Sequence, residues 1–357
     1  PEARQAMLAA MEAFGNPSSV HGEGRAARAI VETAREQVAA LVNARPGEVV
    51  FTSGATEANT FAINGRPWRA LLVGNAEHSA VLAPARRSHA PRLELPCRPD
   101  GVQDFSGVEA WAAALPKSDL PAFASLALAN GETGVVQPVA DLVAMLSPFG
   151  VVVHSDAVQA TGRIAVDFRA LGLSLMSLSA HKMGGPKGVG ALIVRDGTPL
   201  EALLAGGGQE SRRRAGTENV IAIAGFGAAA AAALRDLEHV ARIRDLRDSL
   251  EAELLRTNFD SVLVATDAQR LPNTTLVAMP GKQSETLVIK LDLAGIAVSA
   301  GAACSSGKVG TSHVLEAMGV APEIARGAVR VSLGPSSTTE DVQRFVAAWN
   351  AATGRPA

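Results

Sequence analysis

Several residues that could carry out chemistry directly follow short apolar runs of the chain. Asp156 ends the run GVVVHSD, and Lys182 follows SLMSLSA just before a glycine-rich turn. In FTSGATEAN, backbone N–H groups at Ala55 and Thr56 could bind a phosphate at the start of a helix. A lysine for a covalent link, an acid for a ring nitrogen and a phosphate site are what pyridoxal 5′-phosphate requires. Taken singly, each feature has a plainer interpretation, as a solvated loop residue or a helix N-cap.

One of the two cysteines, Cys304, lies among small residues and glycines in SAGAACSSGK. Small residues bury little area and glycines resist ordering, so we expect residues 305–310 to be exposed and mobile. This setting favours a reactive thiol, whereas Cys97 in LELPCRPDG has no such setting and is interpreted as incidental. Two cysteines without a CxxC pair predict no disulfide framework and no metal site, and they indicate a reducing compartment.

Composition predicts a soluble globular enzyme with two domains. The chain has 357 residues, of which 47% are hydrophobic and 19% are charged, and this length exceeds one ordinary core. A formal net charge of −2 gives no support to a surface that binds nucleic acid or membrane. We find no apolar run long enough to span a bilayer and no signal-peptide pattern. We therefore expect a cytoplasmic protein without nucleic-acid or membrane partners.

The order of apolar runs predicts an α/β fold with a largely parallel sheet. The runs EVVFTSG, ALLVGN, ASLALAN, GVVVHSD, SLMSLSA and GALIV have the length of buried strands, and helix-like stretches separate several of them. A long amphipathic helix begins near residue 236, and TTLVAMPG, GIAVSAG and AVRVSLG follow it as candidate strands. The predicted division is an N-terminal helix (1–14), a large cofactor-binding domain (15–235) and a smaller α+β domain (236–357) that carries Cys304.

Two other motifs imitate nucleotide-binding patterns and fail. GFGAAA, from Gly225 to Ala230, is not followed by the acid that a dinucleotide site needs about twenty residues on, so it is interpreted as a helix with small residues at a packing contact. GAACSSGK has one residue too many between its glycines for a P-loop, and Val309 replaces the required serine or threonine. Neither a dinucleotide enzyme nor an NTPase is predicted.

The motifs, taken in order, resemble those of the cysteine desulfurases, pyridoxal-phosphate enzymes of the class V aminotransferase family. The resemblance covers essentially the whole chain and implies the fold-type I architecture, with a seven-stranded sheet in the large domain. It also implies a homodimer that converts L-cysteine to L-alanine and passes the sulfur to an acceptor such as an iron–sulfur cluster scaffold. The motifs are GNPSSVHGEGR, FTSGATEAN, AEHSAV, ETGVVQP, HSDAVQA, SAHKMGGPKGVGA, RRRAGTEN, ACSSG and VRVSLG.

The resemblance implies a role for each residue of one active site. Lys182 would link to the cofactor, Asp156 would pair with its ring nitrogen, and Cys304 would take the substrate sulfur as a persulfide. Arg330 would bind the substrate carboxylate, for which its planar fork is suited. The other cofactor contacts would come from His78 stacked on the ring, Gln159 at the phenolic oxygen, and Ala55, Thr56, Ser179, His181 and the partner subunit's Thr217 at the phosphate.

Two departures from the family pattern bear on the substrate pocket. The family usually has Asn–Asn–Glu where this chain has Asn130-Gly131-Glu132, so Gly131 offers only backbone, and Asn130 is the candidate that could compensate. The family's first strand would precede Pro1.

Three alternatives stay open from the sequence. These are a selenocysteine lyase, a plain aminotransferase, and an impaired family member that acts as a sulfur relay or scaffold. An aminotransferase has no need of a thiol at Cys304. The intact set Lys182, Asp156, His78 and Arg330 counts against an impaired protein.

Overall fold

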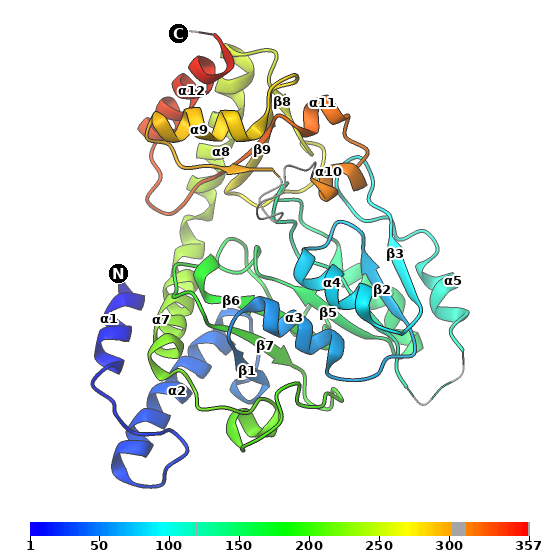
Figure 1. The fold of residues 1–357 in the computed structure, drawn as a ribbon, viewed down its shortest axis with the longest axis vertical. Helices are drawn as coiled ribbons and strands as arrows, with labels where there is room; N and C mark the ends of the chain where they lie inside the picture. The colour runs from blue at the N-terminus through cyan, green and yellow to red at the C-terminus, as the bar shows by residue number, and fades with distance from the viewer. Residues whose placement is uncertain (117, 119, 302–311, 356–357) are drawn as a thin grey trace.

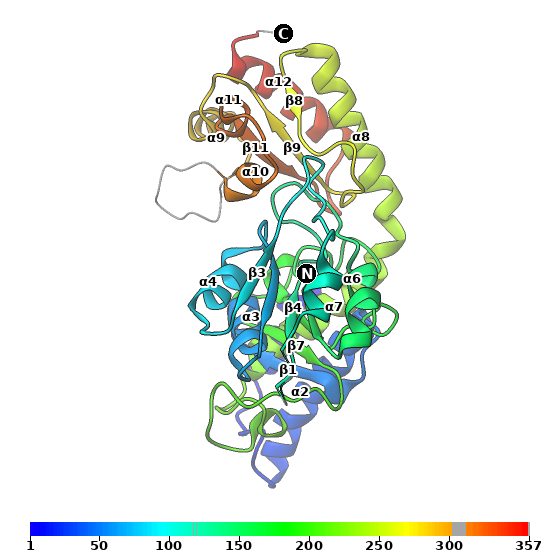
Figure 2. The ribbon, with the colours of Figure 1, turned by 90° about the vertical axis from the view of Figure 1, so that its right-hand side faces the viewer.

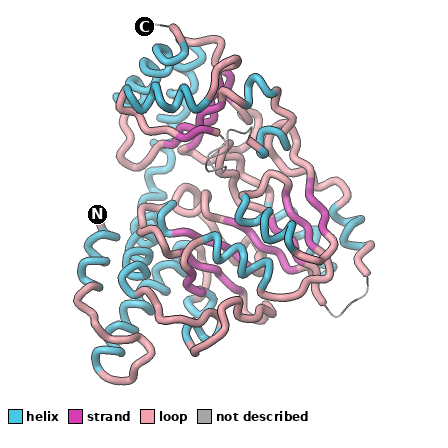
Figure 3. Tube along the Cα trace, in the orientation of Figure 1, coloured by secondary structure: helices cyan, strands magenta, loops and turns pink. Residues whose placement is uncertain are grey.

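The computed structural model describes residues 1–116, 118, 120–301 and 312–355. Cys304 and the predicted mobility of residues 305–310 lie outside the described residues. Two groups of strands are visible (Figure 3), one for each of the two lobes of the molecule. The N-terminal segment α1, which is Glu2–Ala10, ends earlier than the predicted helix over residues 1–14. Met11 and Phe14 are 50% and 88% exposed, so no buried face holds the helix together beyond Ala10.

The larger lobe is built on a seven-stranded sheet in the order β1-β7-β6-β5-β4-β2-β3. Strands β2 to β6 pair in parallel, and β7 is antiparallel to both β6 and β1. All six predicted runs are strands of this sheet, which confirms the largely parallel architecture. The sheet has the seven strands that the family resemblance implies, but no apolar run predicted the position of the seventh: β3 has the sequence RLEL and lies at the edge, with two exposed residues. The strands are β1 Val49–Thr52, β2 Leu71–Gly74, β3 Arg92–Leu95, β4 Phe123–Ser125, β5 Val152–Asp156, β6 Leu175–Ser179 and β7 Gly190–Val194.

Helices cover both faces of this sheet because successive strand residues point to opposite sides. On β5, Val153 packs in the core shared with α2, α6 and α7, whereas Val152 packs in the core shared with α3 and α4. The two faces are seen on either side of the strands in Figures 1 and 2. The helices and 3₁₀ turns of this lobe are α2 Gly22–Leu41, η1 Pro46–Glu48, α3 Ala55–Asn64, α4 Ser79–Arg87, α5 Val108–Ala113, α6 Val139–Leu146, η2 Ser147–Phe149, η3 Ala180–Lys182, η4 Gln209–Arg212 and α7 Val220–Asp236.

The GFGAAA motif lies inside α7, where its glycines allow close helix packing. A Cβ on Gly225 would lie 2.7 Å from Met7 of α1, and one on Gly227 would lie 2.5 Å from the Ala34 backbone of α2. The interpretation as a packing contact is confirmed. The helical run Val220–Thr257 is long and apolar enough to cross a membrane by length and composition, and half of its most apolar window is buried inside the protein. The core helix of a water-soluble protein has the same properties, so this run is weak evidence for a membrane span.

The smaller lobe contains a four-stranded antiparallel sheet in the order β10-β11-β9-β8. Its core includes Leu250, Leu291, Phe345 and Trp349. The predicted GIAVSAG strand is reduced to two residues, because Gly295 and Ile296 donate back to the last turn of the preceding helix. The elements are η5 Leu237–His239, α8 Val240–Thr257, β8 Val262–Leu263, β9 Thr274–Ala278, α9 Ser284–Leu293, β10 Ser299–Ala300, α10 His313–Ala317, α11 Pro322–Ala325, β11 Ala328–Ser332 and α12 Thr339–Thr353.

Candidate active site

A cleft of about 590 Å³ lies where the carboxyl ends of the parallel strands meet the smaller lobe. The loops that follow parallel strands are where α/β proteins place their ligands. The smaller lobe contributes His313, Val314 and Arg330 to the lining. The residues from the sequence prediction that line this cleft are Ala55, Thr56, His78, Asn130, Asp156, Gln159, Ser179, His181, Lys182 and Arg330.

The turn between β1 and α3 has the geometry of a phosphate site. Gly54 has φ +154° and a Cβ there would meet no atom within 4 Å, so the backbone of this turn is open to a ligand. The first bond of α3 runs from the Ala58 N–H to the Gly54 carbonyl, at 3.1 Å. The N–H groups of Ala55 and Thr56 precede that bond, and helix geometry gives them no partner within the helix. An anion placed here also gains from the helix dipole.

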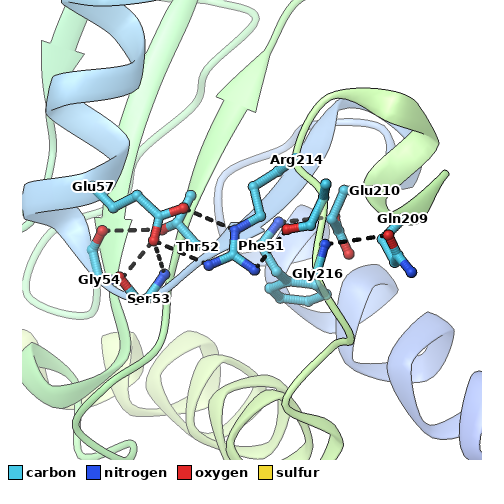
Figure 4. Close-up of polar contacts among 10 residues, drawn as sticks. Phe51, Thr52, Ser53, Gly54, Glu57, Gln209, Glu210, Arg214 and Gly216 are labelled. Carbon is cyan, nitrogen blue, oxygen red and sulfur yellow. Dashed lines mark hydrogen bonds and ion pairs between the residues drawn. The ribbon is translucent and has the colours of Figure 1, made fainter. Parts of the chain in front are cut away.

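The phosphate turn is held by a residue that the sequence analysis did not single out, Glu57. Its carboxylate accepts the Ser53 N–H at 2.8 Å and two bonds from Arg214, at 2.9 and 3.3 Å. Burial acts to raise the pKa of Glu57, but the Arg214 and Ser53 contacts outweigh it and hold this pKa below its ordinary value. The pair joins the turn to the segment that carries Thr217 (Figure 4).

A second carboxylate fixes that segment to the edge strand β1. Glu210 accepts the Phe51 N–H at 2.9 Å and two bonds from Arg35, at 2.8 and 3.0 Å. Glu210, Ser211 and Arg212 all have positive φ, from 46° to 65°, a backbone conformation that residues other than glycine rarely adopt. The buried Glu210 contacts therefore hold a strained turn next to the phosphate site (Figure 4).

Asp156 lies at the floor of the cleft, at the end of the central strand β5. It is buried, and it accepts the Asn59 side-chain N–H at 2.7 Å and the Val158 N–H at 3.0 Å. Burial raises the pKa of Asp156, although the Asn59 and Val158 bonds and the nearby His78 and Lys182 act to lower it. A cationic ring nitrogen above this carboxylate would favour its charged form, which is the role predicted for Asp156.

His78 and Lys182 face the cleft from neighbouring turns. His78 is the N-cap of α4, and its Nδ1 accepts the Ala80 N–H at 3.0 Å. Nδ1 is therefore the acceptor and Nε2 carries the proton of the neutral ring. Burial, followed by the Lys182 and His313 charges, lowers the pKa of His78 against the opposing effect of Asp156. Lys182 ends the short turn η3 after β6, where Ser179 Oγ and His181 Nδ1 lie 2.8 Å apart.

The loop around Gly131 shows how this chain accommodates its glycine. Arg330 donates to the Gly131 carbonyl, and its other terminal nitrogen donates to Ser299 Oγ at 3.1 Å. A Cβ at Gly131 would lie 3.2 Å from Gln159 Nε2, so the Gln159 amide packs directly against the glycine. Asn130 lines the cleft, and its side chain bonds the Ala76 carbonyl at 3.1 Å and the Glu132 N–H at 2.8 Å. Its direct contact with substrate stays a prediction.

Besides Glu57, sequence reasoning did not single out Glu77, Glu132 and His313, which are titratable and line the cleft. His313 Nε2 lies 2.9 Å from the Glu77 carbonyl, and Ser312 donates to the Glu132 carboxylate. Burial raises the pKa of Glu132 and raises that of Glu77 to about 8. Glu77 and Glu132 adjoin predicted site residues, but only the fold shows that their side chains turn inward. His313 gave no signal, because it joins the site from the other lobe.

Two predicted site residues are not in the described cleft. Thr217 is exposed and does not line it, so its contact with a partner's cofactor stays a prediction. Cys304 lies outside the described residues. Cys97 is partly buried, and burial, with the nearby Asp100 charge, raises its pKa to about 11, which agrees with an unreactive thiol. In the ranges that the structure describes, no group of three or more metal-binding side chains occurs.

Comparison with known proteins decides the family. The model of the aminotransferase class-V family matches residues 2–345. The chain belongs to this family. A curated cysteine desulfurase of Cereibacter sphaeroides is 43% identical, over 97% of this chain and 90% of that protein. An IscS-like cysteine desulfurase of Mycobacterium tuberculosis is 40% identical, over 96% of this chain and 90% of that protein.

Solved structures support the same fold. A NifS-like protein from Rickettsia africae superposes with a TM-score of 0.91 at 32% identity, covering 99% of this chain and 96% of that one. A structure described as SspA in complex with cysteine has a TM-score of 0.78 at 28% identity, covering 94% of this chain and 96% of that one. The fold is therefore that of the fold-type I enzymes, as predicted.

The cofactor of this family is pyridoxal 5′-phosphate, and the cleft fits it. The open turn at Gly54, the buried Asp156 and the half-buried Lys182 line one cavity, so phosphate, ring nitrogen and aldehyde each have a matching group. When bound, the cofactor supplies an electron sink. The protein's own part is to orient it, hold the substrate and manage protons.

Proposed function

We propose that this protein is a cysteine desulfurase that converts L-cysteine to L-alanine and transfers the sulfur to its own Cys304. The observation that carries this proposal is the gathering of Lys182, Asp156, His78 and Arg330 around one cleft, in a chain whose relatives at about 40% identity are named cysteine desulfurases. A structural neighbour was solved with cysteine, the substrate that we propose.

Each of these residues has a task that the geometry supports. Arg330 lines the cleft, where the Gly131 carbonyl and Ser299 Oγ hold its terminal nitrogens, and a planar guanidinium suits the substrate carboxylate. His78 carries its proton on Nε2, and this atom can give and take a proton within the cleft. In the reaction the carbon–sulfur bond of L-cysteine breaks and the Cys304 thiolate takes the sulfur as a persulfide. The substrate carbon then takes a proton, which gives L-alanine.

We further propose that two chains form the working unit and that Thr217 enters the site of the partner. Support comes from exposed apolar side chains on neighbouring loops of the larger lobe: Phe14 and Val20 are each 88% exposed, and Leu204 is 43% exposed. The two loops meet at a small cleft that Pro17 shares with Gly208. Light scattering of the active protein tests this proposal, and an active monomer would refute it.

The persulfide must pass to an acceptor, for which we propose a scaffold protein of iron–sulfur cluster assembly, in the cytoplasm. Two curated relatives carry the name IscS, from Dictyoglomus turgidum and Archaeoglobus fulgidus. Cell fractionation followed by transfer of labelled sulfur to purified scaffold tests both points. Membrane-bound enzyme, or failure to label the scaffold, would count against them.

The proposed activity is tested by L-alanine formation from L-cysteine by the full chain, beside a Lys182→Ala variant. We expect stoichiometric alanine and sulfide with a thiol reductant present, and loss of both in the variant. Borohydride treatment of the wild type should fix the cofactor on Lys182, as seen by peptide mapping. Fixation on another lysine would overturn the assignment.

A further inference from the structure

Arg163 bridges two loops of the cleft with a single guanidinium group. Its Nη1 donates to the Gln159 carbonyl at 2.7 Å, and its Nη2 donates to the Lys182 carbonyl at 3.1 Å. Lys182 is 19 residues further along the chain and follows another strand. The two strands, β5 and β6, are parallel neighbours in the sheet. One side chain thus joins the backbone of the residue predicted to hold the cofactor to that of the residue predicted to reach its phenolic oxygen.

The position of Arg163 is costly for a charged side chain. Within the described ranges, no carboxylate forms an ion pair with it; its two bonds are to carbonyl groups. Burial, together with the positive charge of Arg330, lowers the pKa of Arg163 to about 10. It therefore remains a cation at neutral pH, with its charge compensated only by carbonyl dipoles. A charged side chain is expected in such a position where its hydrogen bonds make a contact that an apolar side chain cannot make.

The turn that carries Arg163 explains how it reaches both carbonyls. After Asp156, the chain folds back through bonds from the Ala160 N–H to the Ala157 carbonyl and from the Arg163 N–H to the Ala160 carbonyl, both at 3.0 Å. Arg163 and Lys182 together line a second cavity of about 340 Å³, and no residue of the phosphate turn is among its lining residues. Arg163 therefore holds the Lys182 backbone from outside the cofactor cleft.

We propose that Arg163 is a positioning residue, which fixes the backbone of Lys182 and Gln159 so that their side chains meet the cofactor in register with Asp156. A planar guanidinium has two parallel donors for two carbonyls, whereas a lysine ammonium at this site is a point charge that reaches one of them well. The inference rests on the proposed role of Lys182 as the cofactor lysine.

The chain offers a matched control in Arg195. It also donates to two backbone carbonyls, those of Leu173 at 2.5 Å and Phe168 at 3.4 Å, and it packs over the Phe168 ring. Arg195 does not line the cleft. Arg195→Met should therefore lower thermal stability and leave the bound cofactor unchanged, since it removes the same kind of contact elsewhere.

The test uses the full chain with bound cofactor and compares Arg163→Met, Arg163→Lys and Arg195→Met. The readouts are the visible circular dichroism per bound cofactor, which reports ring orientation, and the rate of cofactor release into a trapping protein. We expect Arg163→Met to reduce the dichroic band and to speed release about tenfold or more, as loss of two charged hydrogen bonds implies. Arg163→Lys should fall between Arg163→Met and wild type.

Two results would overturn the proposal: wild-type dichroism and release in Arg163→Met, or an equal change in Arg195→Met. If Arg163→Met does not fold, Arg163→Lys decides, because wild-type dichroism and release in that variant would show that bridging two carbonyls is not required. Failure here is distinct from failure of the proposed function. If borohydride labels Lys182 while Arg163→Met behaves as wild type, only the positioning role is wrong.

Discussion

The ion pair between Glu57 and Arg214 should couple cofactor binding to the segment that carries Thr217. The two side chains are 14% and 22% exposed, so this ion pair is intermediate in burial between a surface ion pair and a fully buried ion pair. Breaking a buried pair costs about 3–5 kcal/mol and an exposed pair is worth about 0.2–1 kcal/mol. We therefore expect Arg214→Met to lower the free energy of unfolding by about 2 kcal/mol. Glu57 would also hold Ser53 less firmly, so cofactor affinity should fall about tenfold.

A double-mutant cycle separates the pair from its surroundings. Glu57→Gln keeps an oxygen that can accept the Ser53 N–H but loses the charge, and we expect about 1–2 kcal/mol of coupling with Arg214→Met. Arg213→Met is the matched control, because the partly buried Arg213 donates to the Gly47 carbonyl at 3.2 Å and forms no ion pair with a carboxylate in the described part of the chain. Unfolding in urea gives the stabilities, and cofactor titration gives the affinities. Strict additivity of the two changes, with wild-type cofactor affinity in Arg214→Met, would refute the reasoning.

Three further predictions follow from the same geometry. Arg330→Ala should raise KM for L-cysteine about 100-fold, since a bidentate charged contact is worth about 3 kcal/mol, and should leave the cofactor absorption band intact; an unmoved KM would contradict its role. Glu77, whose pKa burial raises from 4.5 to about 8, binds its proton more tightly in the folded than in the unfolded chain. Its contribution to stability is therefore complete below about pH 4.5 and is lost as pH rises through 8, by up to about 1.4 kcal/mol per pH unit. Urea unfolding of Glu77→Gln should lack this decrease in the free energy of unfolding with pH. The same decrease with pH in the variant as in the wild type would argue against this role of Glu77. Iodoacetamide should modify Cys304 well before Cys97, whose raised pKa of about 11 leaves little thiolate, and mass mapping that finds Cys97 first would reverse the assignment.

Strands buried on both faces could be predicted from the sequence because they read as continuous apolar runs. The edge strand β3 could not, because its charged residues, the exposed Arg92 and the partly buried Glu94, break that pattern. The residues at the strand ends, Asp156 and Lys182, were recognisable because a charged side chain directly after a buried strand loses hydration and is expected there only if it has a partner or a function. The first residues of GIAVSAG were misassigned because helix capping by Gly295 and Ile296 outweighed their strand propensity.

Contacts that side chains make with distant backbone carbonyls could not be predicted from the sequence. The bonds of Arg163 to Gln159 and Lys182 depend on how two turns lie side by side, and no residue pattern records this. The same holds for His313, which meets the Glu77 carbonyl across 236 positions of sequence. Such contacts appear only when the sheet order has brought the strand ends together.

The central claim is that sulfur from L-cysteine passes to Cys304. Its most direct test is a single-turnover reaction without reductant, in which the intact mass of the protein and the L-alanine formed are measured together. The account predicts a gain of one sulfur atom per chain, mapped to Cys304, with one L-alanine for each sulfur gained. Cys304→Ser should keep the cofactor and gain no sulfur. A Cys304→Ser protein that still turns over L-cysteine at the normal rate, or a sulfur mapped to Cys97, would contradict the account.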